Sequence, residues 1–206
     1  MKHMPGDVAE GFVGRFSAMA RVDGRPVTLS GWRVAVKDQT VARKVADLLG
    51  GSVFTATHGA EVMTERDSLP IMVSANDISL CMALRSGNDS WHVCDGSTLL
   101  RPEGDRGTPC GCASGLRERR AAARAGRGAV PEVTIAFRLA GAIRLGAFVL
   151  LSSSWDLAAS IPLVLATMED CRDSSLCTLR LRREEFTTSG GVLVTYKRPE
   201  ISVTPQ

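Results

Sequence analysis

Residues 27–51, VTLSGWRVAVKDQTVARKVADLLGG, decide the fold class, because a strand pattern is followed at once by a helix pattern. Residues 27–36 are rich in β-branched and other apolar side chains and come after a Gly-Arg-Pro turn signal, which predicts a strand. Apolar side chains then recur at helical spacing from Val41 to Leu49. Asp38 or Thr40 is placed to cap the start of this helix, and the two glycines at 50 and 51 favour a left-handed stop.

After this unit the sequence predicts further strands and hairpins. Alternating or β-branched runs predict strands at residues 61–64, 69–74, 78–84, 91–94, 133–139, 145–152, 176–186 and 192–203. Turn-forming clusters at 87–90, 140–142 and 189–191 each separate two of these strands, so we expect three hairpins.

Two more helices are expected. Residues 155–168 have a helical pattern with Ser153 or Ser154 as the N-cap, and Pro162 predicts a kink or a break within it. Residues 116–125 contain strong helix formers without an apolar stripe, which predicts a short, exposed, basic helix. The pattern therefore predicts an α+β fold with a mixed or antiparallel sheet and two or three helices. We expect one domain over residues 1–206, with a Cys- and Arg-rich loop and short helix inserted at residues 92–130.

Composition excludes several classes of protein. The 206 residues are 44% hydrophobic and 23% charged, as in ordinary globular proteins, so disordered and fibrous chains are poor explanations. The formal net charge of +3 is too even to indicate a dedicated nucleic-acid binder. No apolar run has the length of a membrane helix or of a signal peptide core, so we expect a cytoplasmic protein that does not interact with membranes.

The cysteines are the most informative side chains. In a reducing compartment they are expected to be thiols or metal ligands rather than disulfides; they are Cys81, Cys94, Cys110, Cys112, Cys171 and Cys177. Four nitrogen or sulfur donors lie in or next to residues 95–115, a glycine-rich stretch without apolar periodicity. They come from the motifs His92-x-Cys94 and Cys110-Gly-Cys112. A structural zinc ion would explain how such a long loop is held. The single residue between Cys110 and Cys112 is shorter than in standard zinc knuckles, so cysteines in a partly buried loop without a metal remain the alternative.

Evidence for catalysis is sparse. The chain has no nucleophile elbow, no HExxH, no P-loop and no GxGxxG after a strand, so no catalytic residue is assigned.

The five arginines between Arg117 and Arg127 could contact phosphate or an acidic protein surface, but aromatic residues for base stacking are not interleaved with them. A solvated helix face is the simpler interpretation of this cluster.

Several segments, taken in order, resemble the recombination directionality factors of actinobacterial phages and their chromosomal relatives, some of which are labelled metal-binding proteins. The matching segments are Gly24-Arg25-Pro26 with Leu29, Trp32-Arg33-Val34, residues 45–51 (VADLLGG), residues 61–64 (EVMT), Cys94-Asp95-Gly96, Gly107 with Cys110 and Cys112, Pro131, and residues 145–148 (LGAF) leading into residues 152–155 (SSSW). The resemblance covers about residues 24–168.

The resemblance also implies a fourth cysteine two residues before Pro131, where this chain has Ala129. The family pattern therefore leaves three cysteine ligands, a site completed by His92, or a site that has lost its metal.

In function, the resemblance implies a non-enzymatic protein that binds a large serine integrase on DNA and switches it from integration to excision. No small-molecule substrate is expected. Two alternatives from other classes stay open: a zinc-dependent hydrolase, with Asp95 as the convenient general base, and a direct nucleic-acid binder through residues 117–127.

Overall fold

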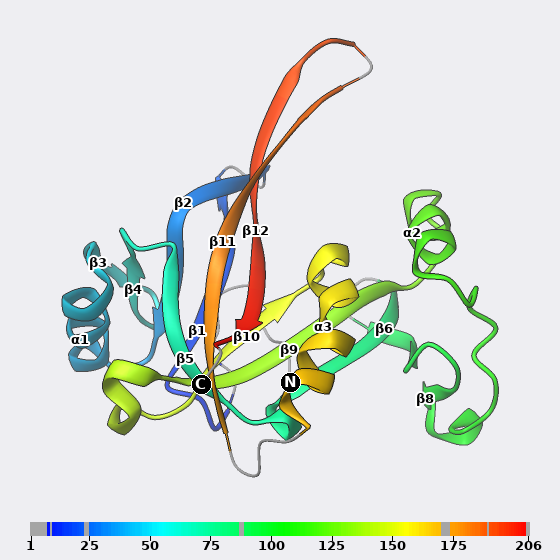
Figure 1. The fold of residues 1–206 in the computed structure, drawn as a ribbon, viewed down its shortest axis with the longest axis horizontal. Coiled ribbons are helices and arrows are strands. Elements are labelled where there is room, and N and C mark those ends of the chain that lie inside the picture. Colours follow the sequence, from blue (N-terminus) through cyan, green and yellow to red (C-terminus); the bar gives the residue numbers. More distant parts are fainter. Residues whose placement is uncertain are drawn as a thin grey trace.

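The strand and helix predicted at residues 27–51 form as β2 (Arg25–Val36) and α1 (Gln39–Leu49) in the computed structural model (Figure 1). The structure describes residue 8 and residues 10–22, 25–86, 89–169, 174–188 and 190–204. Cys171 and the predicted turn residues Gly87, Asn88 and Ser189 lie outside these ranges. Asp38 caps α1 by accepting a 2.6 Å hydrogen bond from the backbone N–H of Thr40.

The fold is α+β, with a mixed sheet whose main path runs in the order β12-β11-β5-β9-β10-β1-β2-β4-β3. Among the described strands, β1 (Gly14–Val22) and β10 (Phe148–Ser152) form a parallel pair, and the other pairs are antiparallel. The other strands of this path are β3 (Ser52–Ala56), β4 (Gly59–Met63), β5 (Ser68–Val73), β9 (Val130–Leu139), β11 (Ser175–Thr187) and β12 (Leu193–Val203).

The sheet branches at β9. Residues 130–135 of β9 pair with β6 (Ile78–Ser86), whereas Arg138 and Leu139 pair with β5. One branch continues from β6 to β7 (Asp89–Cys94) and β8 (Leu99–Arg101), and the other continues from β5 to the hairpin of β11 and β12. The two branches lie on different sides of the molecule (Figure 1). This branching separates the cysteine-rich segment from the C-terminal hairpin.

The main core lies between the sheet and the helices α1 and α3 (Trp155–Met168). Phe16 of β1 is at its centre and makes edge-to-face contacts with Trp32, Phe137 and Phe148. Helix α3 begins at the N-cap Ser154 and packs on β9 and β12 through one apolar face. A break at Pro162, one of the two outcomes predicted, does not occur, because α3 is a single helix across that residue.

Some boundaries and connections differ from the prediction. Strands β1 and β3 were not predicted. The strand predicted at 145–152 begins only at Phe148, because residues Ala140–Leu145 form 3₁₀ turns between β9 and β10 instead of a tight turn. Residues 95–115 are not wholly irregular: they contain β8 and the 3₁₀ turn Glu103–Asp105. In the described part of the chain, no helix is long and apolar enough to cross a membrane.

Candidate metal centre

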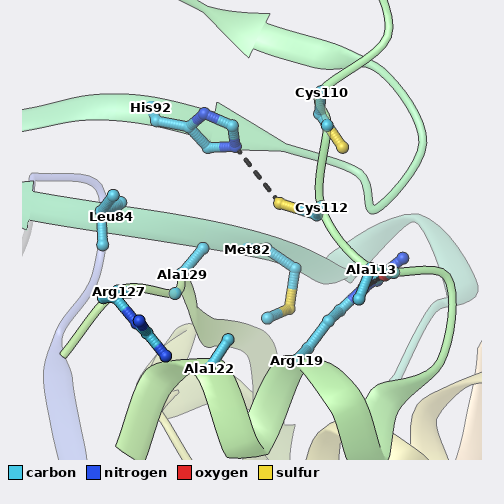
Figure 2. Close-up of a pocket in the computed structure, with 12 residues that line it drawn as sticks. Met82, Leu84, His92, Cys110, Cys112, Ala113, Arg119, Ala122, Arg127 and Ala129 are labelled. Carbon is cyan, nitrogen blue, oxygen red and sulfur yellow. Dashed lines mark hydrogen bonds between the residues drawn. The ribbon is translucent and has the colours of Figure 1, made fainter. Parts of the chain in front are cut away.

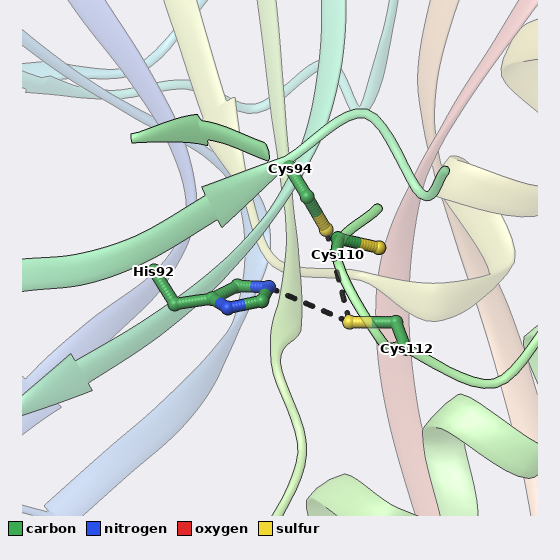
Figure 3. Close-up of side chains that lie close together, drawn as sticks. All are labelled: His92, Cys94, Cys110 and Cys112. Carbon is green, nitrogen blue, oxygen red and sulfur yellow. Dashed lines mark hydrogen bonds between the residues drawn. The ribbon is translucent and has the colours of Figure 1, made fainter. Parts of the chain in front are cut away.

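The β6–β7 hairpin supplies two of the four candidate ligands. Side chains two residues apart on a strand point to the same face, so the β7 residues His92 and Cys94 project together. Val93 lies between them in sequence, and Trp91, the residue before His92, has a side chain that is 56% exposed. The alternation of β7 thus directs one nitrogen donor and one thiol toward the same point (Figure 3).

The loop that follows β7 brings the other two ligands back to this point. Strand β8 pairs with β7, and the backbone N–H of Cys110 donates a 2.9 Å hydrogen bond to the carbonyl oxygen of Ser97. Gly111, between the two cysteines, has a φ of 70°, a left-handed conformation that glycine adopts without a steric penalty. This bend lets the side chains of Cys110 and Cys112 approach the β7 pair (Figure 3).

The four donor atoms lie close enough together to bind one metal ion. The donors of His92, Cys94, Cys110 and Cys112 all lie within 4.8 Å of one another. The Sγ atoms of Cys94 and Cys112 are 3.8 Å apart, and Cys112 Sγ is 3.5 Å from His92 Nε2. Zinc bonds of about 2.3 Å to sulfur and about 2.0–2.1 Å to nitrogen give tetrahedral edges of about 3.8 Å and about 3.6 Å. The donors therefore lie close to one another and can bind a metal ion.

Burial and neighbouring groups shift the pKa values of the three thiols. Cys94 is fully buried, and burial is the largest cause that raises its pKa to about 12. Burial likewise raises the pKa of Cys112. Burial also acts to raise the pKa of Cys110, but the Cys112 backbone N–H, the neighbouring thiols and the charge of Arg119 outweigh it, and the pKa is lowered. Metal binding at neutral pH would displace protons from Cys94 and Cys112.

Arg119 connects the basic helix α2 (Leu116–Arg124) to the loop. Its Nη2 donates hydrogen bonds to the carbonyl oxygens of Gly96 and Ser114, the latter at 3.3 Å, and its Nε donates to the carbonyl oxygen of Ala113. Gly96 has a φ of 101°, and a Cβ there would lie 2.4 Å from Arg119 Nη1. This arginine therefore fixes the loop on both sides of the candidate ligands, a role that the sequence pattern did not indicate.

A cavity of about 250 Å³ separates the cluster from α2. His92, Cys112, Met82 and Arg119 are among the residues that line it (Figure 2). Ala129 also lines this cavity and is buried in a small apolar cluster with Met82 and Cys94. The position at which the resemblance implies a fourth cysteine thus lies beside the predicted ligands.

Other residues noted in the sequence have structural partners. The carboxylate of Asp95 accepts hydrogen bonds from the backbone N–H groups of Ser97 and Thr98 and from the Thr98 hydroxyl, and these bonds lower its pKa. Arg120 forms a 3.5 Å ion pair with Asp156. Of the five arginines in residues 117–127, Arg117, Arg124 and Arg127 are exposed.

Comparison with known proteins identifies the family. A model of the Gp3-like family, described as recombination directionality factor-like, matches residues 9–204. The chain belongs to this family. No solved structure matches it. The family match extends beyond the resemblance noted over residues 24–168 and includes both branches of the sheet. The cluster of His92 and the three cysteines and the C-terminal hairpin are therefore both within the family region.

Proposed function

We propose that this protein is a recombination directionality factor that binds a large serine integrase and switches it from integration to excision. The observation that carries the proposal is the family match over residues 9–204. A factor of this kind performs no chemistry and acts as an accessory protein. It can shift the integrase–DNA assembly only by binding one arrangement more tightly than another. Because the integrase acts on DNA, we place the protein in the cytoplasm.

We further propose that His92, Cys94, Cys110 and Cys112 hold a structural zinc ion, and that residues 92–130 form an insertion in a single domain spanning residues 1–206. The donor set supports this assignment, as do two donor–donor distances that are close to the edges of a zinc tetrahedron. Four protein ligands are typical of a closed structural site, whereas catalytic zinc sites keep one position for water. Bound zinc would cross-link β7 to the loop that carries Cys110 and Cys112.

The functional proposal is tested with the serine integrase encoded nearest the gene. Tagged protein should retain this integrase in a pull-down, and adding it to integrase in vitro should stimulate recombination between the product sites while suppressing integration. A protein that neither binds the integrase nor changes the direction of recombination would refute the proposal.

A zinc-dependent hydrolase is the first alternative, and the cavity beside the cluster is the feature that favours it. This reaction needs a vacant metal position and a general base. All three hydrogen bonds of the Asp95 carboxylate hold the turn at residues 95–98, which leaves it poorly placed to act as that base. Metal-dependent hydrolysis of model esters by the purified protein, abolished in Asp95→Asn, would favour this alternative.

Direct DNA binding is the second alternative, and it would use the exposed side chains of Arg117, Arg124 and Arg127. Binding through phosphate contacts weakens steeply with salt. A steeply salt-dependent affinity for duplex DNA without integrase, lost when these three arginines are replaced by glutamine, would support this alternative. The integrase proposal expects DNA binding that depends on the integrase.

A further inference from the structure

The hairpin of β11 and β12 extends beyond the rest of the sheet as a two-stranded ribbon (Figure 1). Strand β11 pairs with β5 only over residues 175–180, whereas its pairing with β12 continues to Thr187 opposite Leu193. We call residues 183–188 and 190–196 the arm. Two-stranded hairpins are marginally stable by themselves in water, so an arm of this length needs its own stabilising contacts or a partner.

The end of the arm is apolar. Phe186 is 50% exposed, Val192 is 61% exposed and Leu193 is 63% exposed. The register places Phe186 opposite Val194, and the Phe186 ring packs edge to face on Tyr196 with centroids 6.0 Å apart. Leu193 is opposite Thr187 on the other face of the ribbon. Large apolar side chains gathered at the end of a projecting element are typical of a protein-binding surface.

The basic side chains of the hairpin form ion pairs within the protein. Each of the five basic side chains from residue 180 to residue 200 has an acidic partner. The pairs are Arg180–Glu200 at 2.6 Å, Arg182–Glu184 at 3.1 Å, Arg183–Glu185 at 2.6 Å, Lys197–Asp67 at 3.1 Å and Arg198–Glu184 at 2.8 Å. Nucleic-acid binding requires cations that can neutralise phosphates. The hairpin therefore suits an apolar protein surface better than DNA.

We infer that the end of the arm, formed by Phe186, Val192, Leu193 and the Phe186–Tyr196 pair, docks in an apolar groove on the serine integrase. This inference rests on the proposed function and assigns the contact surface that the function requires. The ion pairs of Lys197 with Asp67 and of Arg198 with Asp156 join the ribbon to the rest of the protein, so the aromatic and aliphatic side chains at its end meet the partner with little further ordering. A surface of this kind concentrates binding free energy in a few residues.

The test compares two double variants of the full chain. Phe186→Ser/Leu193→Ser removes the apolar end of the arm. Phe54→Ser/Leu163→Ser is the matched control, because Phe54 is 52% exposed on β3 and Leu163 is 73% exposed on α3, both outside the arm. Integrase affinity is measured by surface plasmon resonance. Circular dichroism and metal content report whether each variant is folded. Val192→Asp, in the turn, is a second arm variant that changes no strand residue.

We expect both arm variants to bind integrase at least tenfold more weakly, with the control within about twofold of the wild type. If the wild type binds but the arm variants bind equally well, the arm assignment is overturned and the proposed function stands. If the wild type does not bind, both proposals are overturned. A concentration-dependent dimer of the wild type that disappears in the arm variants, with integrase binding unchanged, would make a second copy the occupant and would also overturn the inference.

Discussion

His92 is the residue that decides whether the cluster can be a four-ligand site. Its Nε2 is 3.5 Å from Cys112 Sγ, close to the sulfur–nitrogen edge of a zinc tetrahedron. Ala129 stands where the resemblance implies a cysteine, and it is buried in the apolar cluster that contains Cys94. A histidine on β7 is therefore placed where it would supply the donor that position 129 lacks.

From this arrangement we expect that the fourth ligand can be transferred from position 92 to position 129. His92→Ala should weaken zinc binding by at least tenfold, because it leaves three thiols. Adding Ala129→Cys should restore it, since residue 129 borders the same cavity as His92 and Cys112 and a thiol has room there. Cobalt substitution is the measurement: thiolate-to-cobalt absorption should fall in the single variant and exceed the wild-type intensity in the double variant. Unchanged cobalt spectra in His92→Ala would contradict the ligand assignment.

Replacing Arg15 with an apolar residue should stabilise the protein. Its Nε is buried and has no hydrogen-bond partner in the described part of the chain, and burial, followed by the nearby charge of Arg33, lowers its pKa. Both facts mean that the folded state disfavours this charge. Arg15→Met should therefore raise the free energy of unfolding by about 1 kcal/mol. Urea denaturation measures the change, with Arg138→Met, at an exposed position on β9, as the control. A less stable Arg15→Met protein would contradict the prediction.

At the scale of single elements, α2 contacts the loop of the candidate metal centre through the side chain of Arg119. Arg119 contacts the carbonyl oxygens of Gly96, Ala113 and Ser114, and these three residues lie on both sides of the Cys110–Cys112 pair in sequence. Arg119→Met should lower zinc affinity about tenfold, as is typical when groups that orient metal ligands are removed. Arg117→Met, on the exposed side of the same helix, should leave the affinity unchanged. Competition with a chromophoric chelator measures both, and equal affinities would show that the loop is held without Arg119.

The hairpin of β11 and β12 has a pH dependence that follows from Glu200. The hydrogen bond from Arg180 is the first cause that lowers the pKa of Glu200 below its usual value of 4.5. A lowered folded-state pKa stabilises the protein above the unfolded pKa, and this contribution is lost as the pH falls through 4.5 and below. Because Arg180 is half exposed, we expect the contribution to be under about 1 kcal/mol. Glu200→Gln should flatten the stability–pH curve of the wild type between pH ~5 and pH ~3; parallel curves would contradict this.

The elements also show what the sequence could predict. Strand β9 and the first part of β11 alternate more and less buried side chains, and β2 is rich in β-branched and apolar residues. Helices α1 and α3 carry cap residues, so local rules located these elements. Strand β1 was missed because Phe16 is the buried apolar residue in a run that also carries Arg15 and Ser17. Its pairing with β10, more than 130 residues away in the chain, arises from tertiary packing that no local pattern specifies.

For the candidate site too, local sequence patterns identified the residues but not the contacts that bring them together. His92 and Cys94 share a strand face by simple alternation, and the sequence places Cys110 and Cys112 in a glycine-rich stretch as the other pair of donors. The convergence of the two pairs depends on β8 folding back on β7 and on the hydrogen bonds of Arg119. These contacts are non-local, and nothing in an arginine-rich helix distinguishes the side chain that holds a loop from those that face water.

At the scale of the whole molecule, the apolar side chains form two clusters of very different size. The large cluster includes residues from both helices α1 and α3 and from β1, β2, β9 and β10. The small one has Met82, Cys94 and Ala129 as its buried members, with Cys110 and Cys112 packed against it. Apolar burial in a cluster of this size contributes too little free energy to offset the conformational entropy lost when a long loop is ordered. The two parts of the protein should therefore respond differently to loss of a metal.

Chelation should open the cysteine-rich segment without unfolding the main sheet. In the zinc-loaded protein, the amides of Leu99 and Cys110 donate to Thr108 and Ser97 and should be protected from hydrogen exchange. Removing zinc should increase the hydrogen-exchange rates of these amides by at least tenfold. With zinc bound, local opening of the loop must break bonds to the metal, and without zinc it does not. The amides of β10, paired with β9 in the main sheet, should keep their wild-type rates. Equal protection of residues 95–115 with and without zinc would mean that hydrogen bonds and Arg119 suffice to hold the loop; exchange rising equally in β10 would mean that the metal supports the whole fold.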